Sequence, residues 1–442
     1  MKDARCKKQD ARISDVWIRF FYPLSFVFCL LFAQNLFGMR LLIYMDGRQT
    51  DHLRAYGIAY QSLVEDIKVE WLLNYRDGSF LVDYHKDIED LCKIRGVSYS
   101  VVDESQVQRI YITIEENNME RILLEVAPKV AVYIPPNELY TSGSAREPWD
   151  DAVRLALDYA KIPYDKIWDE EVLSGALNQC DWLHLHHEDF SGQYGKFYAS
   201  YRNTPWFQEE MRVNKLMAKR LGFKKVWHLK HAVTEKIAEY VNKGGFLFAM
   251  CSATETIDMA LAAGNVDIVP LVDGDPAEPN CQQKLDFSGT FAFQNFKVDL
   301  NPLLYNHSDI DVSREAQLRG ENVRFTLTNF SAKYDPIPTL LTQNHVRDVK
   351  QFLGQNTGFR RILIKKNVTI LGEVKGTEEV KYIYGDYGKG FFTFYGGHDP
   401  EDYTHLIGDP ATVLELHKNS PGYRLILNNI LFPAAKSKRL KT

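Results

Sequence analysis

The spacing of apolar and polar residues in the middle of the chain predicts a helix, a buried strand and a second helix in immediate succession. Apolar residues recur with helical spacing over residues 233–241, and Gly244 and Gly245 end that helix. Residues 246–250 are continuously apolar, which is typical of a short buried strand. A second helix with an apolar face comes directly after it. Cys251 is therefore predicted where the strand meets a helix N-terminus.

The same patterns, traced along the rest of the chain, predict an α/β protein with a doubly wound, mostly parallel sheet. Strand and helix signals alternate over residues 41–127 and again from Lys129 onward. The alternation then breaks, and residues 291–298 and 323–327 are predicted as antiparallel strands. The predicted organisation is a signal peptide at 1–38, an N-terminal α/β domain at 39–128, a second α/β domain at 129–272 and 360–433, a β-rich insertion or lid at 273–359, and a basic tail at 434–442.

The beginning of the chain has the composition of a leader. A net-basic segment precedes an apolar run at 20–37, which is the arrangement of a secretory signal peptide. We therefore expect export to the periplasm or the extracellular space, with no stable membrane span after cleavage. The alternative is an uncleaved membrane anchor formed by the same run, because its length approaches that of a span.

The net charge limits the possible binding partners, and the cysteine content limits the possible disulfide bonds. Without the leader's six basic and three acidic residues, 47 basic and 55 acidic residues remain, a net charge of −8. This acidic balance, with no basic stripe, disfavours nucleic acid. The expected partner is a small-molecule or carbohydrate-type substrate. The four remaining cysteines are too few and too widely spread for a disulfide scaffold, although a Cys180–Cys281 bridge is left open. The oligomeric state is also left open.

One set of residues fits cysteine-dependent hydrolysis, which needs a thiolate, a histidine base, an orienting carboxylate and donors for an oxyanion. At a helix N-terminus, backbone N–H groups and the helix dipole lower a thiol pKa, and Cys251 is predicted there. His398 comes after a later strand and two glycines. The predicted catalytic residues are Cys251, His398 as base, and Glu401 or Asp399 as the carboxylate. The opposing interpretation is that Cys251 is a buried packing residue.

The densest polar cluster of the chain lies at the end of a predicted strand. On that strand His184 and His186 share one face, whereas His187 points the other way. The residues predicted to hold a substrate are His184, His186, His187, Glu188, Asp189 and Tyr194. A first-row metal bound by two of the histidines and a carboxylate ranks lower, because the spacing matches no zinc signature. We therefore expect no metal and no other cofactor.

Two segments resemble a known fold. Residues 244–253, Gly-Gly-Phe-Leu-Phe-Ala-Met-Cys-Ser-Ala, are similar to the nucleophile elbow of the class I glutamine amidotransferase-like fold, with alanines where that pattern has glycines. Residues 387–401, Tyr-Gly-Lys-Gly-Phe-Phe-Thr-Phe-Tyr-Gly-Gly-His-Asp-Pro-Glu, and the helix predicted over 421–431 are similar to the end of its trehalose-utilisation-type branch. The resemblance covers residues 129–433 apart from the insertion.

This resemblance implies a site at the elbow and, through its branch, a carbohydrate-type substrate. The amidotransferase triad has a glutamate two residues after its histidine, where Pro400 stands here. From Leu41 onward the chain also resembles secreted bacterial proteins catalogued as asparagine synthetase B, but it lacks both the N-terminal-cysteine glutaminase and the Ser-Gly-Gly-x-Asp-Ser loop of such a synthetase. The sequence therefore predicts a secreted hydrolase or amidase with a Cys-His-carboxylate site. The alternative is a non-catalytic or carbohydrate-related binding protein on the same scaffold.

Overall fold

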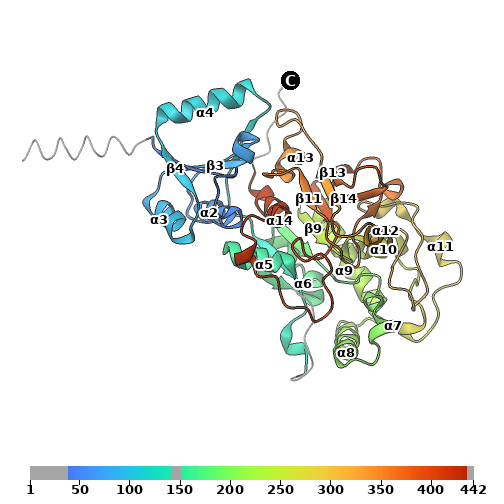
Figure 1. Ribbon diagram of the computed structural model, residues 1–442. Coiled ribbons are helices and arrows are strands. Elements are labelled where there is room, and N and C mark those ends of the chain that lie inside the picture. The colour runs from blue at the N-terminus through green and yellow to red at the C-terminus, as the bar shows by residue number, and fades with distance from the viewer. Residues whose placement is uncertain (1–37, 142–150, 436–442) are drawn as a thin grey trace, which may run out of the picture.

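The computed structural model describes residues 38–141 and 151–435. Apart from Gly38, the predicted signal peptide and the alternative anchor lie outside these residues, as does the tail beyond Ala435. Within the described ranges, no helix is both long enough and apolar enough to cross a membrane. The described chain forms two sheets with helices packed against them (Figure 1).

The first sheet is antiparallel throughout. Its strands are β1 (Arg40–Ile43), β2 (Val69–Leu73), β3 (Ser79–Asp83), β4 (Tyr99–Val102) and β5 (Glu120–Leu124), in the order β4-β1-β3-β2-β5. Helices α2 (His52–Val64) and α3 (Lys86–Arg95) cover one face, and α4 (Glu104–Glu116) covers the other (Figure 1). Side chains alternate between the faces of a strand, so Leu41 and Ile43 join the core around α2 while Leu42 joins the core under α4.

The second sheet is larger and mostly parallel in the half that carries the predicted site. Five parallel strands lie in the order β7-β6-β8-β9-β15, namely β7 (Asp165–Ile167), β6 (Val130–Tyr133), β8 (Trp182–Leu185), β9 (Phe246–Met250) and β15 (Gly390–Tyr395). The sheet continues antiparallel through β14 (Glu379–Tyr387), β13 (Thr369–Glu373), β10 (Arg324–Leu327) and β11 (Asp348–Lys350), and β12 (Phe359–Arg360) pairs with β14. The α/β class predicted from the sequence is therefore confirmed.

Helices cover both faces of the parallel strands. One face packs on α5 (Ala152–Ala160) and α14 (Pro421–Leu431), and the other packs on α6 (Asp169–Ser174), α8 (Pro205–Arg220), α9 (Val226–Asn242) and α10 (Ala253–Ala263). Along β9, Phe248 and Met250 join the first of these cores, and Leu247 and Ala249 join the second. Burial on both faces explains why residues 246–250 are apolar without alternation.

The segment 273–359 contains little β structure of its own. It holds the short helices α11 (Cys281–Lys284), α12 (Ser313–Arg319) and α13 (Pro336–Leu341), and its strands β10 and β11 belong to the edge of the larger sheet. The strand predicted at 291–298 is wrong, because only isolated bridges occur there. The Asp258 carboxylate of α10 instead accepts hydrogen bonds from the N–H groups of residues 291–293, at 2.6–2.8 Å.

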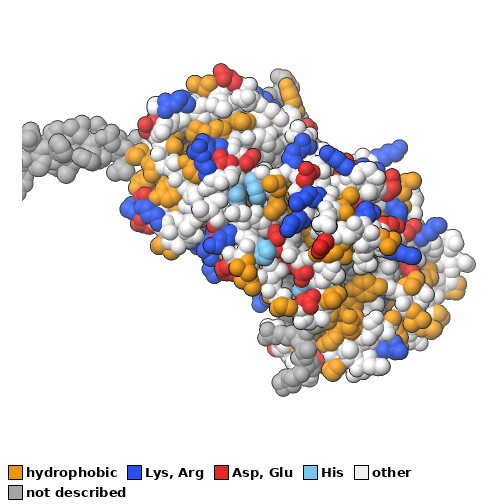
Figure 2. All heavy atoms as spheres, viewed as in Figure 1, with side chains coloured by type: hydrophobic (Ala, Val, Ile, Leu, Met, Phe, Trp, Pro, Cys, Tyr) orange, Lys and Arg blue, Asp and Glu red, His pale blue; other side chains and the backbone are white. Residues whose placement is uncertain are grey.

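The two sheets share one hydrophobic core. Helix α2 packs against both α5 and α14, and the side chains around it form a single cluster that reaches from β1 to β9. Acidic and basic side chains are interspersed on the face shown in Figure 2, without a continuous basic area. All four cysteines of the described residues are free, so the possible Cys180–Cys281 bridge does not form.

Candidate functional site

Cys251 lies at the predicted junction of strand and helix. It comes directly after β9, precedes α10, and has a left-handed backbone with φ of +49°. This conformation is rare for a residue with a side chain and often marks a functional turn. Its N–H donates to Gly397 O at 3.2 Å, which joins the elbow to the turn that carries His398. Burial raises the pKa of the thiol to about 11, although backbone N–H groups of Gln355, Asn356 and Ser252 partly offset that effect.

The structure does not assemble the predicted cysteine site. No hydrogen bond joins Cys251 to His398 among the described residues, because His398 Nδ1 faces His186 and its Nε2 makes no hydrogen bond. Asp399 accepts hydrogen bonds from the Tyr423 hydroxyl at 2.8 Å and from the Glu401 N–H at 2.9 Å. Glu401 pairs with His417 Nδ1 at 3.0 Å. Both predicted carboxylates therefore serve other partners.

The histidines instead converge around Asp151. This residue is the N-cap of α5, and its Oδ1 accepts from the N–H groups of Val153 and Arg154 at 2.8 and 3.0 Å. The same oxygen lies 3.2 Å from His184 Nε2 and 3.3 Å from His186 Nδ1. His184 and His186 therefore share a face, as predicted. Burial alone would raise the pKa of Asp151, but the two histidines hold it well below its usual range.

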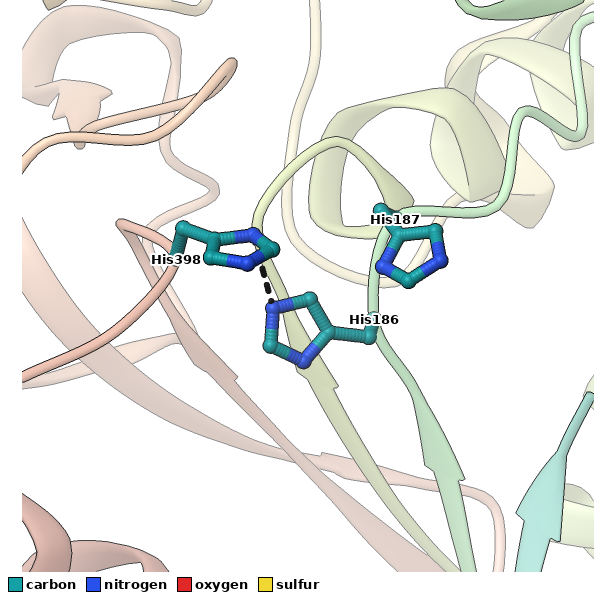
Figure 3. Close-up of side chains that lie close together, drawn as sticks. All are labelled: His186, His187 and His398. Atoms are coloured by element: carbon teal, nitrogen blue, oxygen red, sulfur yellow. Dashed lines mark hydrogen bonds between the residues drawn. The ribbon is translucent and has the colours of Figure 1, made fainter. Parts of the chain in front are cut away.

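His186 connects Asp151 to His398. Its Nε2 lies 3.1 Å from His398 Nδ1, and the rings of His186, His187 and His398 face one another (Figure 3). One ligand atom from each of the three lies within 4.8 Å of the others. His187 thus joins the cluster despite the predicted opposite orientation, because β8 ends at Leu185 and strand alternation stops there. We call His186, His187 and His398 the histidine trio.

The turn after β15 fixes His398 in this position. Gly397 has φ of +94°, and a Cβ there would lie 2.5 Å from the Phe352 ring. The ring of His398 stacks on His405 at 4.6 Å, and His405 Nδ1 lies 2.9 Å from Asp402. Burial, and then the neighbouring histidines 186, 187 and 405, lower the pKa of His398 well below its usual value. The ring is therefore neutral near pH 7.

A small cavity borders the trio. In the parallel-strand order, β6 and β8 are neighbours whose chain connections leave in opposite directions, which is where ligands bind in open α/β sheets. The cavity lies at their carboxyl ends and measures about 40 Å³, room for about three waters. Its walls include His187, Glu188, Asp189, Tyr194, Trp168 and Lys230. His187 is thus the trio member that lines the cavity.

The predicted substrate-binding residues that line the cavity have different structural roles. Asp189 shapes its own loop, because its carboxylate accepts from the N–H groups of Ser191 and Gly195 at 2.8 and 2.7 Å. Burial would raise its pKa, but His307 and these donors lower it to about 2. Glu188 accepts from the His186 N–H at 2.8 Å and so holds the end of β8. Tyr194 is buried against the cavity, with its hydroxyl 3.5 Å from Asp273.

Two contributors to the site, Asp151 and Lys230, are not among the residues that the sequence singles out. Asp151 was signalled only as an acidic residue before a helix, the position that favours an N-cap. Lys230 lies 2.9 and 3.0 Å from the two oxygens of Asp169, and its ammonium lies 4.8 Å from the Trp168 ring. Lys230 carries no sequence signal, because a lysine within a helix is usually a solvated residue.

Comparison with known proteins adds little to this geometry. No protein-family model and no curated protein sequence matches the chain. Two solved cytoplasmic proteins from Salmonella typhimurium match 70% of this chain over 100% of their own, at 11% and 12% identity and TM-scores of 0.34 and 0.32. A catalytic mutant of a GH42 beta-galactosidase from G. stearothermophilus matches 61% of this chain and 27% of its own, at 13% identity and a TM-score of 0.24. These superpositions are too loose to support an argument about function.

Proposed function

We propose that the larger sheet has a glutamine amidotransferase-like core, as the resemblance of residues 244–253 and 387–401 implies. Two features support this proposal. The parallel strands lie in the order 2-1-3-4-5 along the chain, which is a common doubly wound order. The left-handed Cys251 between β9 and α10 also has the conformation expected of an elbow.

On this core we propose an exported hydrolase that acts on a small polar substrate, of carbohydrate or amide type, at the histidine trio. The observation that carries the proposal is the connected series from Asp151 through His186 to His398, beside His187 in the cavity wall. Such a series of carboxylate and imidazoles fixes ring orientation and tautomer. A 40 Å³ cavity admits the reacting group and its water but no whole sugar ring, so the rest of the substrate lies outside it.

The proposed chemistry is general acid–base catalysis by an imidazole. In hydrolysis, water adds its hydroxyl to the electrophilic carbon, and its other proton goes to the leaving group. A neutral histidine next to the cavity takes that proton from the attacking water and returns it to the leaving group. His187 is placed for this step because it lines the cavity, and His186 and His398 lie behind it.

The test is a hydrolysis screen of amides, esters and glycosides with wild type, His187→Gln and the control variant His85→Asn. His85 is an exposed histidine of the N-terminal sheet, so its variant should retain full activity. We expect His187→Gln to lose roughly 10²–10⁴-fold in kcat/KM, the usual contribution of general acid–base catalysis. A ligand that binds wild type but is never hydrolysed would favour the non-catalytic binding protein instead.

A second candidate is the cysteine-dependent hydrolase, which the strained backbone of Cys251 specifically favours. In that mechanism His398 would have to leave His186 to reach the thiol. Cys251→Ala separates the two candidates, because it removes the nucleophile but keeps a small apolar side chain at the elbow. Retained hydrolysis by Cys251→Ala supports the histidine mechanism, whereas abolished hydrolysis in a folded variant supports the cysteine.

A further inference from the structure

The imidazoles of the trio have the separations of metal ligands. Zinc binds imidazole nitrogen at about 2.0–2.1 Å, so two ligands of a tetrahedral ion lie roughly 3.4 Å apart. His186 Nε2 and His398 Nδ1 are already 3.1 Å apart, and one nitrogen from each of the three histidines lies within 4.8 Å of the other two. The two segments that supply the ligands are 212 residues apart in the chain.

His186 Nε2 and His398 Nδ1 are hydrogen-bond partners of each other, so a bound cation would replace this single contact. His186 Nδ1 lies 3.3 Å from Asp151 Oδ1 without forming a hydrogen bond, and its Nε2 faces His398. His398 Nε2 is buried and makes no hydrogen bond, so each of these two rings keeps one buried nitrogen without a partner.

Asp151 is the positioning residue of this cluster and not a ligand. Its Oδ1 already accepts two backbone N–H groups of α5 and faces His184 and His186. Four contacts already surround Oδ1, so we assign Asp151 to orienting His186 and not to coordination. A carboxylate behind a ligating histidine is the usual outer partner in zinc sites, where it orients the ring and raises its basicity.

We propose that His186, His187 and His398 bind one divalent first-row transition-metal ion of the zinc class, with Asp151 orienting His186 and an open coordination position toward the cavity. Three imidazoles and an open position are the ligand set of a hydrolytic zinc centre. The cavity beside His187 has room for the water in that position. The inference deepens the proposed function and rests on it only for the role of the ion. That role is to activate water, because a bound ion lowers the pKa of water from 15.7 to about 7.

The experiment measures metal directly. Full-length protein is purified without chelator, stripped with a chelator, dialysed, and titrated with Zn²⁺ and with Co²⁺, whose absorption spectrum reports the coordination number. We expect one ion per chain in wild type and in His85→Asn, and a tetrahedral Co²⁺ spectrum. His187→Gln and His398→Asn should each lose more than the roughly 100-fold in affinity that the loss of an outer partner costs.

Asp151→Asn tests the positioning role. Asparagine keeps the N-cap of α5 but removes the charge, so we expect a loss of about 10–100-fold in metal affinity with helix stability retained. His187 is half-buried, and its variant is expected to fold even if His398→Asn does not. Wild type that binds no stoichiometric Zn²⁺ or Co²⁺, or a folded His187→Gln that binds as tightly as wild type, overturns the metal site. Metal-loaded protein that hydrolyses nothing in the screen overturns the proposed function and leaves the metal site standing.

Discussion

At Cys251 two effects on the thiol oppose each other, and burial is the larger. The junction with α10 provides backbone N–H groups that stabilise a thiolate, yet the residue is only 3% exposed and its pKa is about 11. A position between a strand and a helix N-terminus therefore does not by itself activate a cysteine. An adjacent cation or base has to supply the rest, and His398 faces elsewhere.

This balance predicts the reactivity of the thiols in the folded protein. At about pH 8 we expect iodoacetamide to modify half-buried Cys180 faster than Cys251, as monitored by mass spectrometry of the peptides. Cys92 is the matched control, because it is buried and burial raises its pKa to about 12. It should react only after denaturation. Rapid modification of Cys251 near neutral pH would contradict the burial argument and favour the cysteine mechanism.

The residues of the site show what sequence can and cannot supply. The run from His184 to His187 is visible as a polar cluster at a strand end, and strand geometry places His184 and His186 on one face. Asp399 and Glu401 are neighbours of His398 in sequence, but Tyr423 and His417 engage them. The carboxylate that does face the histidines, Asp151, is 33 residues from His184. Only the packing of α5 against the sheet brings it there.

Among the elements, the turn between β15 and His398 has the tightest steric requirement near the site. Gly397 combines a positive φ with a close approach to Phe352, while Gly408 has nearly the same φ, +93°, and open space around it. A comparison of substitutions at the two glycines therefore separates the cost of a left-handed backbone from the cost of crowding.

We expect Gly397→Ala to be much more damaging than Gly408→Ala. The left-handed backbone costs an alanine about 1–2 kcal/mol at either position, and overpacking against Phe352 adds about 1–3 kcal/mol at Gly397 only. Chemical denaturation measures the difference in the free energy of unfolding. Metal affinity or hydrolysis should also fall in Gly397→Ala, because His398 moves with the turn. Equal losses of stability in the two variants would show that the turn relaxes away from Phe352.

The segment 291–298 shows why one predicted element fails. Its phenylalanines are buried, and an apolar alternating pattern is what a strand requires. The Asp258 carboxylate satisfies three consecutive N–H groups that a neighbouring strand would otherwise bind. A single distant side chain thus replaces a strand pairing, and no local pattern reveals such a replacement.

For the whole molecule, the periodicity of apolar residues predicts the fold class well but predicts the pairing of the strands poorly. The α/β class and the helices on both sides of the parallel strands can be inferred from the alternation of elements. The purely antiparallel N-terminal sheet cannot, because the order β4-β1-β3-β2-β5 depends on which strands meet in space. The shared core of α2, α5 and α14 likewise joins parts that the sequence divides into domains.

This junction between the two sheets predicts loss of stability in acid. His52 of α2 stacks on His345 at 4.3 Å, and burial lowers their pKa values from 6.5 to about 4 and about 3. The neighbouring Arg424 contributes to both of these shifts, and His52 contributes to that of His345. The pKa of each histidine is lower in the folded chain than in the unfolded chain, so the contribution of these histidines to stability is fully present above pH 6.5. That contribution is lost as the pH falls below 6.5, because the unfolded chain then takes up protons that the folded chain does not. At about pH 5 each histidine then costs roughly 2 kcal/mol.

The measurement is the free energy of unfolding at about pH 7 and pH 5 for wild type and His345→Phe. Phenylalanine keeps the stacking on His52 and removes one titrating group, so the difference between the two pH values should shrink by about 2 kcal/mol. His85→Asn replaces an exposed histidine and should leave the difference unchanged. An equal pH dependence in wild type and His345→Phe would exclude His345 as a source of acid sensitivity.

Arg424 links the two sheets most directly, and its loss should uncouple them. Its fully buried guanidinium donates to Met45 O at 2.9 Å, to the Tyr56 hydroxyl at 3.1 Å and to Asp77 O, all in the N-terminal part.

Arg424→Met removes a costly buried charge, but it leaves the buried acceptors unpaired. Each unpaired acceptor costs about 1–3 kcal/mol, so the net loss of stability should exceed about 3 kcal/mol. Wild type should melt in one transition and Arg424→Met in two, the first from the N-terminal sheet. Exposed Arg109→Met should change stability by less than about 0.5 kcal/mol. A single, unshifted transition in Arg424→Met would mean that apolar packing around α2 alone couples the sheets.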